Sequence, residues 1–181
     1  MIELDRRHML EGLAALIGLS ALSGEALAAA AKKPPLLDAP TTALLVAVCD
    51  TLIPRTDTPG AVQVKVPATI DALLRDWANP AHRAAHLAAL KAIDTAARAK
   101  TGKPFALLTP AARKTFLSAY DAENFAGNPD YYKLKDLLVT AYYMSEPGAT
   151  QELRYEHIPG AWEPSIPLTK DTRAWAGHNV G

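Results

Sequence analysis

Two histidines in an alanine-rich stretch are the residues of this sequence whose spacing best suits metal chemistry. His82 and His86 are four positions apart, so on a helix both imidazoles would lie on one face, where they could share a metal ion. The glutamate that follows the first histidine in zinc-hydrolase helices is absent, and the sequence places no third ligand. Two partly exposed histidines on an alanine-rich helix are the simpler interpretation, and a metal-binding protein remains the alternative.

Sequence motifs for other cofactors are missing. The sequence has no glycine-rich phosphate loop, so we expect no nucleotide or flavin in this chain. It has no CxxCH motif for haem attachment, and its single cysteine, Cys49, cannot hold an iron–sulfur cluster. No local signature of a serine or cysteine nucleophile with its histidine and acid is present. We therefore expect no catalytic residue, no metal and no cofactor in the chain itself.

The functional residues are expected to be positioned by helices, because no stretch of the sequence alternates apolar and polar residues as a β-strand does. Three polar residues that precede a proline, Asn79, Thr109 and Asn128, each predict the start of a helix. Their side chains can cap the first turn, and proline is tolerated there because it needs no hydrogen bond. Apolar periodicity over residues 41–53 predicts another helix, capped by a threonine at its start.

One more helix is expected between the helix at residues 41–53 and the helix that starts at Asn79. Pro67 suits its first turn, and a Pro59-Gly60 turn precedes it. Its apolar stripe should comprise Ile70, Leu73, Leu74 and Trp77. The sequence thus predicts an all-α fold, a small helical bundle with an extended C-terminal segment. The four predicted parts are a signal segment at 1–31, a linker at 32–40, the helical bundle at 41–145 and the extended segment at 146–181.

The N-terminal segment has the features of an export signal. Arg6 and Arg7 precede a weakly apolar stretch at residues 9–22, and small residues follow it. Paired arginines with weak hydrophobicity are typical of the twin-arginine route, which carries folded proteins, and an ordinary secretory signal is the alternative. The stretch is too short and too rich in small residues to predict a membrane-spanning helix.

The C-terminal segment combines four prolines with aromatic residues and lacks helical periodicity. Solvated disordered tails are poor in aromatics, so Tyr155, Trp162 and Trp175 indicate a segment that lies against a surface. That surface is either its own bundle or another protein. The 19 basic and 19 acidic residues of the chain balance, so a nucleic-acid partner is not expected.

Three stretches together resemble the gluconate 2-dehydrogenase subunit 3 family. They are the twin-arginine-like start, "VCDTLIPRTDTPGAVQVKVPATIDALL" at residues 48–74 and "YYMSEPGATQELRYEHIPGAWEPSIPL" at residues 142–168. The last stretch carries most of the resemblance, because "SEPGATQELRY" followed by "IPG" is a specific pattern.

The resemblance implies a non-catalytic small subunit in a periplasmic dehydrogenase complex. Its partner would be a large catalytic subunit of the glucose-methanol-choline oxidoreductase type, which binds FAD and oxidises a sugar, polyol or glycoside. A c-type cytochrome with haem c would accept the electrons. The small subunit would supply the twin-arginine signal for a partner that lacks one. The complex would lie in the periplasm, either free or on the periplasmic face of the inner membrane. The alternative is a stand-alone exported helical protein that binds metal through His82 and His86.

The same resemblance, together with the aromatic composition of the tail, assigns the contact with the large subunit to the C-terminal segment. A second contact is expected at Arg55 and Asp57, in the turn-rich stretch before Pro67. The residues expected at the main contact are Tyr142, Tyr143, Glu146, Arg154, Tyr155, His157, Pro159 and Trp162.

Overall fold

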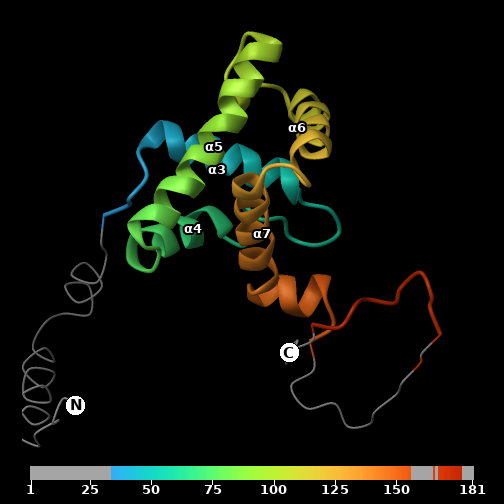
Figure 1. Cartoon of the computed structure of the whole chain (residues 1–181). Coiled ribbons are helices and arrows are strands. Elements are labelled where there is room, and N and C mark those ends of the chain that lie inside the picture. Colours follow the sequence, from blue (N-terminus) through green and yellow to red (C-terminus); the bar gives the residue numbers. More distant parts are fainter. Residues whose placement is uncertain (1–33, 156–164, 166, 177–181) are drawn as a thin grey trace, which may run out of the picture. The chain divides into compact units, whose positions relative to one another are not determined.

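The computed structural model describes residues 34–155, 165 and 167–176, and this part of the chain is helical (Figure 1). The elements are α3 (Ala39–Leu52), α4 (Val66–Asp76), α5 (Pro80–Thr101), the 3₁₀-helix η2 (Phe105–Leu107), α6 (Pro110–Asn124), α7 (Pro129–Tyr143) and the π-helix η3 (Gly148–Glu152). The predicted all-α bundle is confirmed. None of the helices in the described ranges has the length and apolar character needed to cross a membrane.

The three predicted polar–proline helix starts are confirmed in atomic detail. Asn79 caps α5 by accepting a hydrogen bond from a backbone N–H at 2.8 Å. Thr109 caps α6 and Asn128 caps α7 in the same way, at 3.3 and 3.1 Å. Each cap satisfies one of the backbone donors that a helix start leaves free, and the proline that follows removes another. These boundaries are therefore set by local chemistry.

The first helix begins two residues before the predicted position. Asp38, rather than a threonine, is the cap, and its carboxylate accepts from the backbone N–H of Thr41 at 2.9 Å. The sequence Asp38-Ala39-Pro40 is a fourth polar cap with a proline in the first turn, separated by one residue. The predicted linker at 32–40 therefore ends earlier, and Leu37 is already buried in the core.

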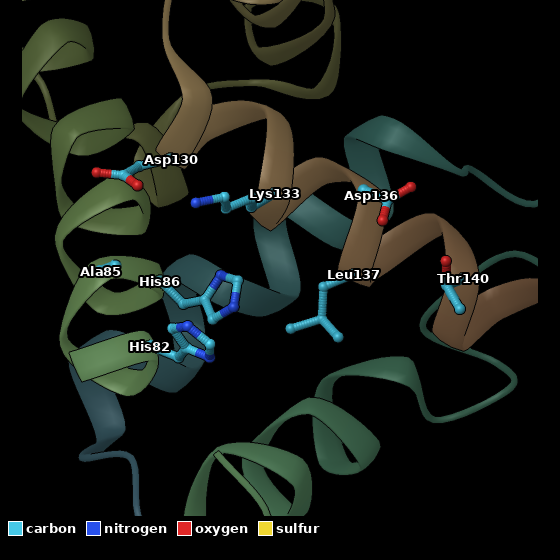
Figure 2. A pocket seen from close by; sticks show the side chains of 8 residues that line it. All are labelled: His82, Ala85, His86, Asp130, Lys133, Asp136, Leu137 and Thr140. Atoms are coloured by element: carbon cyan, nitrogen blue, oxygen red, sulfur yellow. The ribbon is translucent and has the colours of Figure 1, made fainter. Parts of the chain in front are cut away.

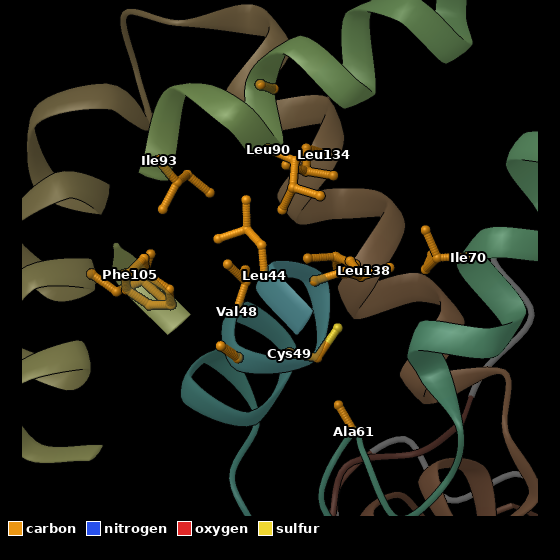
Figure 3. Close-up of a cluster of buried hydrophobic side chains, with 14 of the residues drawn as sticks. Leu44, Val48, Cys49, Ala61, Ile70, Leu90, Ile93, Phe105, Leu134 and Leu138 are labelled. Carbon is orange, nitrogen blue, oxygen red and sulfur yellow. The ribbon is translucent and has the colours of Figure 1, made fainter. Parts of the chain in front are cut away.

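The core is built around α3, which packs against α4, α5, α6 and η2 (Figure 3). Leu45 and Val48 of α3 are buried, and Cys49 lies beside them as the predicted small apolar group. Burial raises the pKa of the Cys49 thiol to about 12, so the thiol stays protonated and unreactive at neutral pH. Ile93 and Leu138 bring α5 and α7 onto the same cluster. Helix–helix packing therefore supplies the hydrophobic core.

The sequence predicted that Trp77 belongs to the apolar stripe of α4, and this prediction is wrong. Trp77 lies just past the end of the helix, and its side chain is strongly exposed. The guanidinium of Arg83 covers the end of α4 instead, donating to the carbonyls of Leu74, Arg75 and Ala78. A basic side chain suits the carbonyl-rich C-terminus of a helix, so this arrangement closes α4 without the indole.

The chain between α3 and α4 turns back sharply onto the end of α3. The backbone N–H of Ala61 donates to the carbonyl of Ile53 at 3.0 Å, which closes the loop formed by residues 54–60. Gly60 is buried at the closing point, and a Cβ there would lie 2.6 Å from the backbone nitrogen of Arg55 and 2.7 Å from the carbonyl oxygen of Ile53. Only glycine fits this close approach. The hydrogen-bonded turn follows at residues 61–65 and not at Pro59-Gly60, where the sequence predicted it.

Replacing Gly60 by alanine should therefore lower the free energy of unfolding by about 1–3 kcal/mol, because the atoms it meets are backbone and cannot rotate away. Urea unfolding followed by circular dichroism at 222 nm measures this loss. Gly127→Ala is the matched control: an added Cβ there meets nothing within 4 Å, so the change should stay within about 0.5 kcal/mol. Equal effects of the two substitutions would contradict the close-approach explanation.

Candidate functional site

The two stretches that carry the family resemblance, residues 48–74 and 142–168, each contribute lining residues to one groove. The groove has a volume of about 440 Å³. Five residues form one wall: Leu52, Ile53, Pro54, Thr56 and Thr58. The other wall is formed by residues from the second half of α7 and by Glu152 of η3. The lining combines apolar side chains with threonine hydroxyls, a carboxylate and Lys135. A surface of mixed apolar and polar character that gathers two distant stretches is a reasonable docking site for another chain.

Two side-chain hydrogen bonds join the 54–60 loop to the C-terminal part of the chain. The Tyr142 hydroxyl donates to the carbonyl oxygen of Pro59 at 2.9 Å. The Thr58 hydroxyl donates to a carboxylate oxygen of Glu152 at 2.6 Å, across 94 residues of sequence. Thr58 is only 6% exposed, so its hydroxyl has little access to solvent. These bonds fix the groove walls relative to one another.

Tyr142 is a core residue and not the surface residue that the sequence predicted at the interface. It is 2% exposed, and burial raises the pKa of its hydroxyl, which therefore stays protonated as a donor to Pro59. Its neighbours Tyr143 and Met144 are exposed, Met144 at 80%. At the C-terminal end of α7, exposed apolar surface therefore begins at Tyr143.

The segment after Glu146 starts with a helical turn, whereas the sequence predicted no helix there. The residues Gly148–Glu152 form one π-helical turn, in which the backbone N–H of Leu153 donates to the carbonyl of Gly148 at 3.0 Å. Gly148 packs against the backbone carbonyl of Tyr142 so closely that a Cβ would overlap it. A π-turn has no strong periodic signature over five residues, so the hydrophobic pattern could not predict it.

Beyond η3 the chain folds partly onto itself. The backbone of Arg154 exchanges two hydrogen bonds with Ala174 and Ala176, at 2.8 and 2.9 Å, in an isolated parallel bridge. The Arg154 guanidinium lies 4.1 Å from the ring centre of Trp175, a cation–π contact, where the sequence had predicted a partner contact. Arg173 also lies 3.8 Å from the carboxylate of Asp57. The C-terminal segment therefore contacts its own chain at these points.

The other predicted site residues divide into two groups. Arg55, Asp57, Glu146 and Tyr155 are exposed at the surface, and Asp57 is paired with Arg173. Arg6, Arg7, His157, Pro159 and Trp162 lie outside the described residues. Thr58 and Glu152 were not singled out by the sequence, because nothing in their types or spacing pairs two residues so far apart.

His82 and His86 line a separate pocket of about 290 Å³ between α5 and α7 (Figure 2). Both imidazoles project from one face of α5, as the spacing predicted, and Lys133 reaches toward them from α7. Asp130 and Asp136 complete the charged lining. Within the described ranges, no group of three or more histidine, cysteine or acidic side chains is placed to hold a metal ion.

The environment of His86 favours the neutral imidazole. Burial lowers its pKa below the ordinary value, and the charges of His82 and Lys133 lower it further against the opposing effect of Asp130. The Nδ1 atom of His86 is buried and has no hydrogen-bond partner in the described part of the chain. Protonation of this residue in the folded protein is therefore unfavourable.

This environment predicts a pH dependence of stability. Because the pKa of His86 is lower when folded than when unfolded, the unfolded chain binds the extra proton more readily below about pH 6.5. The free energy of unfolding should thus fall as the pH drops from 7 to 5, by at most about 1.4 kcal/mol per pH unit from this residue. Urea titrations of wild type and His86→Gln measure the contribution, and equal pH slopes in the two proteins would contradict it.

Comparison with known proteins agrees with the resemblance seen in the sequence. The chain matches the family described as gluconate 2-dehydrogenase subunit 3 over residues 39–160. This range runs from the first residue of α3 through α7 and η3, so it includes both walls of the groove. No curated protein and no solved structure was found to match the sequence. The family match covers well over half of the chain, and the protein belongs to the gluconate 2-dehydrogenase subunit 3 family.

Proposed function

We propose that this chain is the non-catalytic small subunit of a periplasmic dehydrogenase complex, required for the export, assembly and stability of the catalytic subunit. The single observation that carries the proposal is the family match over residues 39–160, whose name designates one subunit of a dehydrogenase. The sequence adds support, since it has no nucleotide-binding loop, haem motif or nucleophile signature.

The proposed partner is a large FAD-binding subunit of the glucose-methanol-choline type. It would oxidise a CH–OH group of a sugar, polyol or glycoside and pass the electrons to a c-type cytochrome. In this division of labour the flavin and the haem belong to the partners. The small subunit contributes a surface and the export signal. Arg6 and Arg7 would then direct both subunits to the twin-arginine route, because a partner that folds around FAD in the cytoplasm must cross the membrane folded.

The groove and its rim are the surface that we assign to the catalytic subunit. Tyr143 lines the groove and is exposed, and the exposed residues Met144 and Tyr155 follow the lining residues Tyr143 and Glu152 by one and three positions. Large exposed side chains of this kind are enriched in interface centres. Tyrosine buries much apolar area while losing little side-chain entropy. An exposed methionine adapts its shape to a partner. Together they provide apolar contacts around a groove whose polar lining can fix the orientation of the bound chain.

The export signal is tested by substituting Arg6→Lys with Arg7→Lys in a strain that expresses both subunits. The positive charge is kept but the paired arginines are lost, so this chain and the dehydrogenase activity should both remain in the cytoplasm. Fractionation followed by a dye-reduction assay with sugars and polyols measures the distribution. Lys32→Arg with Lys33→Arg is the control outside the signal and should export normally. Unchanged periplasmic activity of the arginine variant would remove the shared-export proposal.

The docking surface is tested by substituting Tyr143→Ala with Met144→Ala. Loss of two exposed interface side chains should raise the dissociation constant for the catalytic subunit at least tenfold. This corresponds to a loss of about 1.4 kcal/mol or more of binding free energy. Leu107→Ala is the matched control, because Leu107 is 74% exposed but lies in η2, outside the groove lining. Biolayer interferometry with the purified subunits measures both. A similar loss for the control, or none for the double variant, would contradict the assignment.

A further inference from the structure

We propose that the hydrogen bond between Thr58 and Glu152 is a positioning contact, which sets the direction in which the C-terminal segment leaves the bundle and meets the catalytic subunit. This inference rests on the proposed function, and it names the residue, Glu152, that orients the docking segment. Glu152 acts through the backbone that follows it and need not touch the partner itself.

The contact belongs to a row of three, in which successive residues of one loop hold successive parts of the C-terminal region. Pro59 accepts from Tyr142 at the end of α7. Thr58 donates to Glu152 at the end of η3. The preceding loop residue, Asp57, lies 3.8 Å from the guanidinium of the more distal Arg173. The bond from Thr58 to Glu152, at 2.6 Å, is the shortest of the three contacts. In the loop it lies between the contact of the buried Tyr142 and the contact of the exposed Asp57.

The π-turn explains why Glu152 reaches the loop. Gly148 must lie directly against the carbonyl of Tyr142, and its N–H is also held by the Ser145 hydroxyl at 3.2 Å. The wide turn that follows ends at Glu152, and Leu153 continues in an extended conformation, with φ −101° and ψ 166°. The side chain of Glu152 therefore fixes the chain at the residue where helical structure stops. Arg154, which pairs with Ala174 and Ala176, follows two residues later.

A fixed exit direction has a clear value for docking. An extended segment loses conformational freedom when it binds, and each part that is already oriented in the free chain lowers this cost. The exposed Tyr155 is three residues beyond Glu152, so the orientation set at Thr58 reaches it through a short stretch of backbone. Releasing Glu152 should thus leave the helices intact and weaken binding of the partner.

The test compares Glu152→Ala with Glu152→Gln in the full chain. Alanine removes the acceptor, whereas the glutamine amide oxygen can still accept from Thr58. The Thr58 hydroxyl keeps a second contact, to the Thr56 hydroxyl at 3.3 Å, so the alanine variant does not leave it without a partner. We expect Glu152→Ala to raise the dissociation constant for the flavin-containing catalytic subunit at least tenfold. The dissociation constant of Glu152→Gln should stay within threefold of the wild-type value.

Two further measurements separate positioning from folding. The urea midpoint of Glu152→Ala should match that of wild type. Its amide hydrogen exchange should be faster at Leu153, Arg154 and Ala176, and Glu152→Gln should restore the protection. A lowered midpoint that accounts for the binding loss, or unchanged exchange at these amides, would overturn the positioning role. If the wild-type chain itself binds no flavin-containing subunit while the exchange results hold, the proposed function fails and the orienting contact stands.

Discussion

The close backbone approach at Gly60 is the constraint on which the rest of the groove depends. Because no side chain stands between the loop and the end of α3, the 54–60 loop folds back and presents its residues toward α7 and η3. The bonds at Thr58 and Pro59 can form only from that position. A second close approach, at Gly148, places η3 on the other side. Two glycines thus determine where the two walls of the groove stand.

The helical bundle supplies the stable frame for this arrangement without any covalent cross-link. The single cysteine is buried and protonated, so it contributes as an apolar side chain. Capping satisfies the starts of α3, α5, α6 and α7, and the core around α3 joins the helices. The helices α3 to α7 that form this frame lie within residues 39–160, the range that matches the gluconate 2-dehydrogenase subunit 3 family.

Local chemistry explains how far the sequence predicts this structure. Helix starts at Asn79, Thr109 and Asn128 follow from one cap and one proline each, so they could be predicted within a residue. Periodicity placed Trp77 in the core, but α4 ends at Asp76, and the side chain of Trp77 beyond it is exposed while Arg83 binds the carbonyls at the helix end. The bond between Thr58 and Glu152 depends on the fold of the whole bundle, so no local pattern of one sequence contains it.

The long sequence separation of the groove contacts also has a consequence for the order of folding. Helices form from neighbouring residues and fold early, whereas contacts across 83 and 94 residues require the intervening chain to be ordered first. Tyr142 and Glu152 also leave the ribosome long after the loop that they bind. The groove contacts can therefore form only when α7 and η3 have joined the bundle, so the groove and the C-terminal part of the core are completed together.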